Sequence, residues 1–389
     1  MRLAYLYPEH LGRPDARVLQ VAANCRALAK SGAELHLICG RFRGLERRLA
    51  GLGLDGVPGL TVHAVAMWQP GPGLRVPFSW GGLYQASAWS QLRRLAGQSV
   101  DAVLVRHLKL AAFLLPRVKE IGLPLIFEAH EFFSQTAAEE GAPAAKAATL
   151  EALERQVFLG ADRVIAISQP LAKALEQYGA PAPVAVAPSG VDESFFNIDH
   201  AQREYDLAAY AGGLGPWKGV DLLIEAASLV PEMRLEILGG QQSGTDWQRL
   251  NVLVGRLALG QRLVMRPRAD QDAVRGLLAR AGIAVWPGTG RQRIAAEFTS
   301  PLKLFEYLAA GCVVIAPKVP AAESVLIHQE NALLFEPDNA VSLAEALRQL
   351  MNNPDLAQQL SQAGRALACK YTWQARAEVM KQVVTEAIS

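Results

Sequence analysis

The stretch "SPLKLFEYLAAGCVVIA" (300–316) joins a helix to a strand, and this pairing is repeated throughout the chain. Ser300 is a favourable N-cap residue and Pro301 is favoured at the first helical position, which predicts a helix over 301–310. Apolar residues surround the axis of this helix almost completely, so we expect it to be buried. The apolar, β-branched run that follows predicts a buried strand.

Strand and helix patterns alternate along all 389 residues. This alternation predicts an α/β fold with parallel sheets covered on both faces, and the length favours two domains. The series restarts after a polar stretch, so we expect two similar domains with a ligand cleft between them. The predicted parts are an N-terminal domain (1–190), a linker (191–206), a C-terminal domain (207–371) and a final helix (372–389) that joins the first domain.

The composition argues against several classes of protein. The formal net charge is +2, so the overall charge does not indicate binding to nucleic acid. The four cysteines are scattered singly, which favours buried free thiols over a disulfide framework or a metal site. No apolar run is long enough to span a bilayer, and the N-terminus lacks a signal-peptide pattern, so we expect a cytoplasmic protein.

Three segments outside the regular pattern have two interpretations each. Residues 68–82 and 134–148 are either plain connections or loops that select an acceptor. Residues 41–50 carry four arginines among apolar residues. We favour a surface helix there, and the alternative is a segment that rests on anionic lipid.

Lys303 and Glu306 are three residues apart on the predicted apolar helix and therefore lie on the same flank. They are either an internal ion pair or two parts of a ligand site. A lysine in the first turn has the same sign as the helix dipole, which is unfavourable unless an anion binds there. We therefore favour the ligand site.

A second lysine stands at another helix start. In "YAGGLGPWKGVDLLIEAA" (210–227) a strand ends in Gly212 and Gly213, and Lys218 precedes the next helix. This is neither a Walker sequence nor a GxGxxG motif, so an ordinary turn is the alternative. Two helix starts with one lysine each favour a diphosphate.

His130 and Glu131 follow the strand "LPLIFEA" and are candidates for acid–base chemistry on an acceptor hydroxyl. A loop histidine without a role is the alternative. Arg106 and His107 lie at the end of a neighbouring strand and are weaker candidates for the same chemistry.

Other charged residues have simpler explanations. Asp270 and Asp272 form a DxD sequence, but they precede a helix, where a capping role is favoured over a metal–nucleotide site. Arg291 and Arg293 are solvated loop residues or lie near phosphates. We predict no metal site.

The ordered set "ADRVIAISQPLAKAL", "VAPSGVD", "GPWKGVDLLIEAA", "LEILGG", "SPLKLFEYLAAGCVVIA" and "NALLFEP" resembles the family-4 glycosyltransferases along nearly the whole chain. The resemblance implies the GT-B architecture, with two facing Rossmann-like domains, and transfer with retention. It also implies a UDP- or GDP-sugar as donor substrate, no cofactor and no metal.

The resemblance also implies roles for individual residues. Lys218 contacts the donor diphosphate, Glu306 holds the ribose hydroxyls and His130 lies near the acceptor and the transferring sugar; these three are the predicted catalytic residues. The predicted donor-binding residues are Gly12, Gly213, Lys218, Ser300, Pro301, Leu302, Lys303 and Glu306. Gly12 belongs to the loop 10–18, which stands where the family has a glycine-rich loop.

The chain departs from the family pattern at three places. Phe298 stands eight residues before Glu306, where relatives often have a glutamate, and Glu297 is one residue out of register. Gly213 stands where an arginine is usual. Gly12 is all that remains of a glycine pair.

From these features we expect a retaining glycosyltransferase of glycan, glycolipid or polysaccharide biosynthesis. Its acceptor is not identified by the sequence and could be lipid-linked, with peripheral contact at the inner face of the membrane. The alternatives are a non-catalytic nucleotide-sugar-binding relative and a nucleotide-sugar epimerase. A dinucleotide oxidoreductase is disfavoured, because no GxGxxG follows the first strand.

Overall fold

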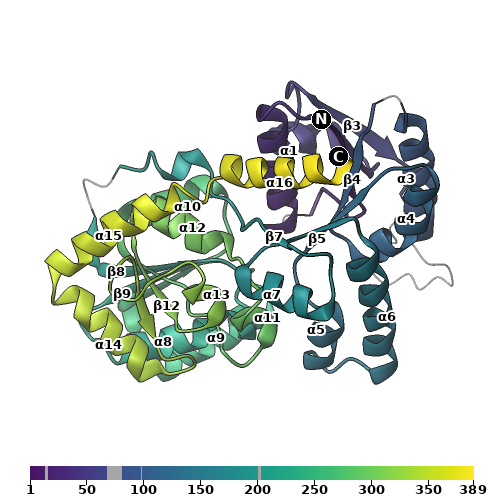
Figure 1. Ribbon diagram of the computed structural model, residues 1–389. Helices are drawn as coiled ribbons and strands as arrows, with labels where there is room; N and C mark the ends of the chain where they lie inside the picture. Colours follow the sequence, from purple (N-terminus) through teal and green to yellow (C-terminus); the bar gives the residue numbers. More distant parts are fainter. Residues whose placement is uncertain (14–15, 68–80, 98, 200–202) are drawn as a thin grey trace. The chain divides into compact units, whose positions relative to one another are not determined.

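The computed structural model describes residues 1–13, 16–67, 81–97, 99–199 and 203–389 (Figure 1). The chain divides into two compact units: unit 1 comprises Met1–Pro188 and Trp373–Ser389, and unit 2 comprises Ser189–Thr372. Most of the predicted loop 68–82 lies outside the described residues, as do residues 14 and 15 of the loop 10–18.

The described part of unit 1 contains a seven-stranded parallel sheet with the order β3-β2-β1-β4-β5-β6-β7. Its strands are β1 (Arg2–Tyr7), β2 (Glu34–Gly40), β3 (Leu60–Val65), β4 (Ala102–Val105), β5 (Leu125–Ala129), β6 (Arg163–Ala166) and β7 (Ala185–Val186). Its helices are α1 (Ala16–Lys30), α2 (Leu45–Gly51), α3 (Gly81–Leu95), α4 (Leu108–Glu120), α5 (Phe133–Glu139), α6 (Ala144–Gly160), α7 (Gln169–Tyr178) and α16 (Trp373–Ile388).

The described part of unit 2 contains a six-stranded parallel sheet with the order β10-β9-β8-β11-β12-β13. Its strands are β8 (Glu204–Ala211), β9 (Arg234–Leu238), β10 (Leu263–Arg266), β11 (Ala281–Val285), β12 (Val313–Pro317) and β13 (Leu333–Phe335). Its α-helices are α8 (Val220–Ser228), α9 (Thr245–Arg256), α10 (Gln271–Arg280), α11 (Arg293–Ala296), α12 (Leu302–Ala309), α13 (Pro320–Glu323), α14 (Ala340–Met351) and α15 (Pro354–Ala368). Short 3₁₀ turns are η1 (Glu193–Phe195), η2 (Pro216–Lys218) and η3 (Gly260–Arg262).

Both sheets follow the Rossmann strand order, in which the order reverses beside the first strand of each unit. The reversal lies between β1 and β4 in unit 1 and between β8 and β11 in unit 2. In such sheets ligands bind at the carboxyl ends of the strands at this switch point. The predicted α/β fold of two Rossmann-like domains is confirmed.

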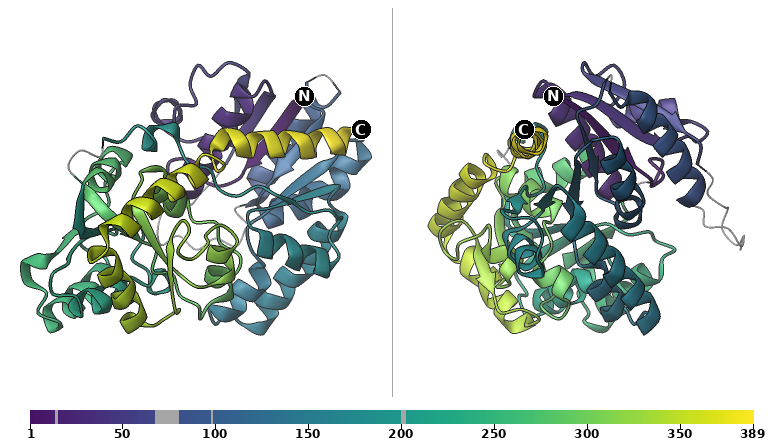
Figure 2. Two further views of the ribbon diagram at one scale, coloured as in Figure 1. Left: turned by 60° about the vertical axis from the view of Figure 1, so that its left-hand side comes forward. Right: turned by 45° about the vertical axis from the view of Figure 1, so that its right-hand side comes forward.

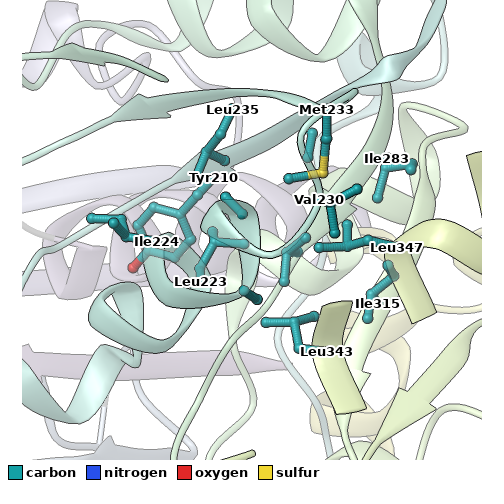
Figure 3. Packing of buried hydrophobic residues seen from close by; sticks show 14 of the residues in the cluster. Tyr210, Leu223, Ile224, Val230, Met233, Leu235, Ile283, Ile315, Leu343 and Leu347 are labelled. Carbon is teal, nitrogen blue, oxygen red and sulfur yellow. The ribbon is translucent and has the colours of Figure 1, made fainter. Parts of the chain in front are cut away.

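The core of unit 2 covers both faces of its sheet, because side chains alternate along β8. Tyr210 packs on one face with Leu223 and Ile224 of α8, as Figure 3 shows. Ala211 faces the other side, in the core that contains Phe305 of α12. Helix α12 is buried along most of its surface, as its sequence predicts.

The final helix α16 packs in the core of unit 1, although it follows unit 2 in the sequence. Ala377, Met380 and Val384 lie in the same buried cluster as Val21 and Cys25 of α1. Both ends of the chain are drawn in unit 1 in each view (Figures 1 and 2). Arg376 also lies on the buried side of this helix.

Two segments differ from the sequence-based expectation. Residues 191–199, predicted as part of a linker, belong to unit 2, because Phe195 is buried and the Val191 amide donates to the Tyr371 carbonyl. Within residues 134–148, predicted as a loop, residues 134–139 lie in α5, whereas residues 144–148 begin α6, a helix that the sequence pattern also predicts over 144–160. The buried carboxylate of Glu154 accepts hydrogen bonds from the amide and hydroxyl of Ser134 and so fixes the first turn of α5.

Candidate functional site

The glycine-rich turn after β8 lies at the switch point of the unit 2 sheet. Gly219 ends η2 with a φ of 71°, and a Cβ there would overlap the Pro287 carbonyl oxygen just beyond β11. Only glycine allows this close approach. The η2 turn, and with it Lys218, is thereby held at the carboxyl end of the sheet.

Tyr307 of α12 fixes that helix beside the same turn. Its hydroxyl accepts a hydrogen bond from the Ala211 amide at 2.7 Å and donates one to the Ala211 carbonyl at 3.2 Å. Ala211 is the last residue of β8. Lys303, one turn earlier on α12, is therefore brought to the end of this strand.

Two lysines from separate elements lie near one another here. Lys303 Nζ donates a hydrogen bond to the Tyr210 hydroxyl at 2.7 Å, and that hydroxyl donates to the Gly213 carbonyl at 2.6 Å. Lys218 Nζ lies 3.3 Å from the centroid of the Trp217 ring. Within the part of the chain that the structure describes, neither ammonium forms an ion pair with a carboxylate.

Burial lowers the pKa of both lysines. Loss of solvent brings the pKa of Lys218 down to about 8. For Lys303, loss of solvent and then the Lys218 charge hold the pKa well below its usual value, while Glu306 acts in the opposite direction. Two desolvated cations without a counter-ion favour the binding of an anion, which would restore the charged form of each.

The N-cap of α12 is not Ser300, which the sequence predicts for this position. The helix begins at Leu302, and its N-cap is Pro301, which provides no side-chain bond. Ser300 Oγ instead accepts from the Ser189 amide at 2.9 Å, and the Ser300 carbonyl accepts from Ser189 Oγ at 2.8 Å. The amides at the start of α12 therefore have no capping side chain and can serve an anion.

Glu306 lies half-buried on α12, one turn after Lys303. Loss of solvent raises the pKa of its carboxyl to about 7, opposed by the Lys303 charge and by a hydrogen bond from the Gln271 side chain. Near neutral pH this group exists in both forms and can accept or donate hydrogen bonds. Such a carboxyl is suited to hold hydroxyl groups of a ligand.

In unit 1, His130 follows β5, which neighbours the switch-point strand β4, and both of its ring nitrogens have partners. Nε2 lies 2.6 Å from Glu128 Oε1, and Nδ1 lies 3.3 Å from an Arg106 guanidinium nitrogen. The carboxylate accepts and the guanidinium donates, so Nε2 carries the proton and Nδ1 is the acceptor. Loss of solvent and then the Arg106 charge lower the pKa of His130 to about 4, so the ring is neutral at pH 7.

The other predicted residues of unit 1 have local contacts. The Gly12 amide donates to His10 Nδ1 at 2.9 Å, and Gly12 is exposed. His107 caps α4 by accepting from the Leu110 amide at 3.3 Å. Burial raises the pKa of the Glu131 carboxyl. His107 thus has a structural role, and Arg106 belongs to the contacts of His130.

The two aspartates of the DxD sequence have structural roles at the N-terminus of α10. Asp270 Oδ1 accepts from the Ala273 amide at 2.9 Å, which confirms the cap interpretation, and Asp272 pairs with Arg275. Across the described ranges of the chain, no group of three or more His, Cys, Asp or Glu side chains is arranged to hold a metal ion. Arg291 lies 3.7 Å from Asp338.

Phe298 is a buried residue with 2% of its surface exposed. The Arg293 guanidinium lies 5.0 Å from the centroid of its ring, and Arg293 also pairs with Glu297 at 2.8 Å. Glu297, the glutamate next to Phe298, therefore forms an ion pair with Arg293 near the surface. Phe298 contributes to packing at this position.

Sequence reasoning missed four residues that support these sites, namely Tyr210, Gln271, Glu128 and Arg376. Three of them gave no usable signal, because their contacts come from distant parts of the chain. Arg376 did give one, since it interrupts the apolar stripe of a helix that is otherwise buried on that side.

No helix among the described residues combines the length and apolar character needed to cross a bilayer.

Family profiles match both halves of the chain. The profile described as Glycosyltransferase Family 4 matches residues 19–195, and that described as Glycosyl transferases group 1 matches residues 191–367.

Curated relatives are similar over part of their length. An uncharacterized glycosyltransferase of Methanocaldococcus jannaschii is 23% identical over 215 residues, which cover 55% of this chain and 56% of that protein. The D-inositol 3-phosphate glycosyltransferase of Thermobispora bispora is 26% identical over 256 residues, covering 60% of this chain and 58% of that protein. The matched regions thus span less than two thirds of these relatives.

Solved structures share the fold along the whole chain. Sucrose-phosphate synthase from Thermosynechococcus elongatus superposes with a TM-score of 0.75 and 18% identity, covering 99% of both chains. The Anabaena protein HepE in complex with UDP superposes with a TM-score of 0.75 and 16% identity, covering 99% of this chain and 100% of that one. With the two profiles matching in sequence along residues 19–367 and this shared two-domain fold, the chain belongs to the family-4 glycosyltransferases of GT-B architecture.

Proposed function

We propose that the chain transfers a sugar, with retention, from a UDP- or GDP-sugar to an acceptor hydroxyl. The observation that carries the proposal is the pair Lys218 and Lys303, two desolvated cations that share the carboxyl end of β8 and have no carboxylate partner among the described residues. A diphosphate supplies the charge that this pair needs. The donor class has further support from HepE, whose structures contain UDP and UDP-glucose.

In the proposed reaction, the bond between the sugar C1 and the diphosphate oxygen breaks, and the acceptor oxygen bonds to C1 on the same face. The acceptor proton passes to the departing phosphate. Lys218, Lys303 and the uncapped start of α12 stabilise the charge that develops on the leaving group, which is electrostatic catalysis. Glu306 holds the ribose hydroxyls and so places the diphosphate against the lysines.

The ribose assignment predicts a difference between two ligands. Glu306→Gln keeps the shape of the side chain but removes the carboxylate, so it should weaken UDP binding about tenfold while changing the affinity for 2′,3′-dideoxy-UDP less than twofold. Calorimetry on both ligands makes the comparison, with Glu345→Gln as an exposed control in unit 2. Equal losses for the two ligands would contradict a ribose contact.

Turnover separates transfer from the alternatives. A thermal-shift screen with UDP, GDP, ADP and their sugars identifies the donor, because a ligand of the native state raises apparent stability. Incubation of that sugar nucleotide with the protein should then release nucleoside diphosphate slowly, by hydrolysis. Conversion of the free donor into an epimer, or binding without any turnover, would overturn the proposal. NMR of the product with an accepted sugar tests retention at C1.

We also propose that the lysines make a metal ion unnecessary for departure of the leaving group. Activity should then be the same with EDTA as with added Mg²⁺ or Mn²⁺. A loss in EDTA that Mn²⁺ restores would contradict this part of the proposal alone.

A further inference from the structure

Glu128 is a fully buried carboxylate on β5 that receives hydrogen bonds from three side chains, two of them on other elements. Oε1 accepts from His130 Nε2 at 2.6 Å and from the Arg376 guanidinium at 2.7 Å. Oε2 lies 3.4 Å from the Tyr5 hydroxyl of β1. A buried charge needs such partners, and the Arg376 and His130 contacts hold the pKa of Glu128 far below its usual value despite burial.

Arg376 brings the final helix into this network, and its own surroundings fix its position. Nε donates to Asn24 Oδ1 of α1 at 2.8 Å, and another guanidinium nitrogen donates to the carbonyls of Ala187 and Pro188. The remaining nitrogen reaches Glu128. Arg376 is 3% exposed, so every donor faces protein. The planar guanidinium group can donate to the amide, carbonyl and carboxylate oxygens at the same time, whereas the ammonium group of a lysine cannot.

The orientation of His130 depends on the same carboxylate. The Glu128 contact keeps the proton on Nε2, and Arg106, which is itself tied to Gln20 Oε1 at 2.9 Å, faces Nδ1. The ring is thus clamped between an acceptor and a donor, at the carboxyl end of β5. If Glu128 moves, both the direction of the ring and its tautomer lose their support.

We propose that Arg376 of the C-terminal helix α16 is a positioning residue for His130 and acts through Glu128. The inference rests on the proposed transfer reaction for its catalytic meaning, because it takes His130 to lie at the reacting groups. The final helix would then be part of the acceptor-side machinery, in addition to its packing in unit 1.

The direct test reads the His130 ring itself, without turnover. NMR on histidine-labelled protein, with His130→Gln to assign the signal among the seven histidines, should show the Nε2–H tautomer and a ring that stays neutral at pH 6 in the native protein. Glu128, Arg106 and Arg376 are the charged groups that face the ring, and the Tyr5 hydroxyl lies beyond Glu128. Removing the Arg376 cation in Arg376→Met should raise the pH at which the ring titrates.

Kinetics supply the second measurement. Arg376→Met should lower kcat at least about tenfold while the KM for the donor changes less than about threefold, and Arg376→Lys should recover part of the loss. Lys381→Met is the matched control, since Lys381 lies on the same helix and donates to the Ser31 carbonyl at 2.7 Å, away from Glu128. It should leave both the His130 titration and kcat unchanged.

Arg376→Met removes the guanidinium that pairs with the buried Glu128 carboxylate and could fail to fold, which circular dichroism would show. Arg376→Lys and Asn24→Ala keep the positive charge and then carry the test. A native His130 titration and native kcat in both folded variants would overturn the inference. Failure of the native protein to transfer any sugar would instead overturn the proposed function. The two failures can be distinguished, because the NMR signal of His130 is measured without a substrate.

Discussion

Lys303 donates a hydrogen bond to the Tyr210 hydroxyl at 2.7 Å, and it forms no ion pair with Glu306, one turn further along the same helix. Of the two interpretations that the sequence left open, the structure therefore disfavours the internal ion pair. The lysine and the glutamate instead remain available to different parts of one ligand, a diphosphate and the hydroxyls beside it.

Lys218→Ala and Lys303→Ala should each weaken binding of a nucleoside diphosphate. The loss of one charged hydrogen-bond partner corresponds to about 1.5–3 kcal/mol, or roughly 10–100-fold in Kd. Calorimetry should show a smaller loss for the nucleoside monophosphate. Lys370→Ala is the control, because Lys370 is an exposed lysine of unit 2. Equal affinity of both variants and the native protein for the diphosphate would refute the assignment.

Donor affinity should be highest between about pH 7 and pH 8. The Glu306 carboxyl, with its pKa raised to about 7, loses its charge as the pH falls, and the Lys218 ammonium, with its pKa lowered to about 8, loses its charge as the pH rises. Because the ligand is best bound by a carboxylate and an ammonium, affinity falls on both sides.

Variants can assign the two limbs of this profile in calorimetric titrations from pH 5.5 to 9.5. Glu306→Gln should flatten the acid limb, and Lys218→Ala should reduce the alkaline limb, where Lys303 also contributes. Titrating a sugar nucleotide in parallel removes the pH dependence of phosphate ionisation, because its esterified diphosphate has no group that titrates in this range. A profile that is identical in native protein and both variants would show that other groups control binding.

Gly213→Arg should strengthen binding of the diphosphate. Gly213 is exposed, and the nearest heavy atom to an added Cβ would be Lys218 Cε at 4.0 Å, so the site accepts a side chain without displacement. An arginine there would add a bidentate phosphate donor, and an increase of about tenfold in affinity is expected. Gly213→Gln, which adds comparable length without charge, should have little effect. A gain of the same size in both variants would point to packing rather than charge.

Phe298→Ala should cost about 3–5 kcal/mol in the free energy of unfolding, because the side chain is almost fully buried. Denaturation with urea measures this cost, and Phe298→Leu should lose much less. Donor selectivity of the folded Phe298→Leu protein, measured across the sugar nucleotides, tests whether this position, where relatives often have a glutamate, also influences the choice of donor. An unchanged unfolding free energy in Phe298→Ala would contradict the core position of the ring.

The sequence by itself determined the strand–helix alternation, the two Rossmann-like units and the positions of most helices. These follow from local periodicity and from glycine and proline signals, which act within a few residues. The cap role of Asp270 was also predictable, because its acceptor and the Ala273 amide are three residues apart. Ser300 was a local prediction that failed, since its hydroxyl is used by the distant Ser189 amide.

Only the tertiary structure decided which side chains share a site. Tyr210 and Lys303 are 93 residues apart, and Glu128 and Arg376 are 248 residues apart. Nothing in the local pattern of either residue specifies such a partner. The sheet brings strand ends together at one edge, and the return of α16 to unit 1 delivers Arg376 to Glu128. Burial then sets the ionisation of these groups, since desolvation depends on the assembled core and not on the neighbouring sequence.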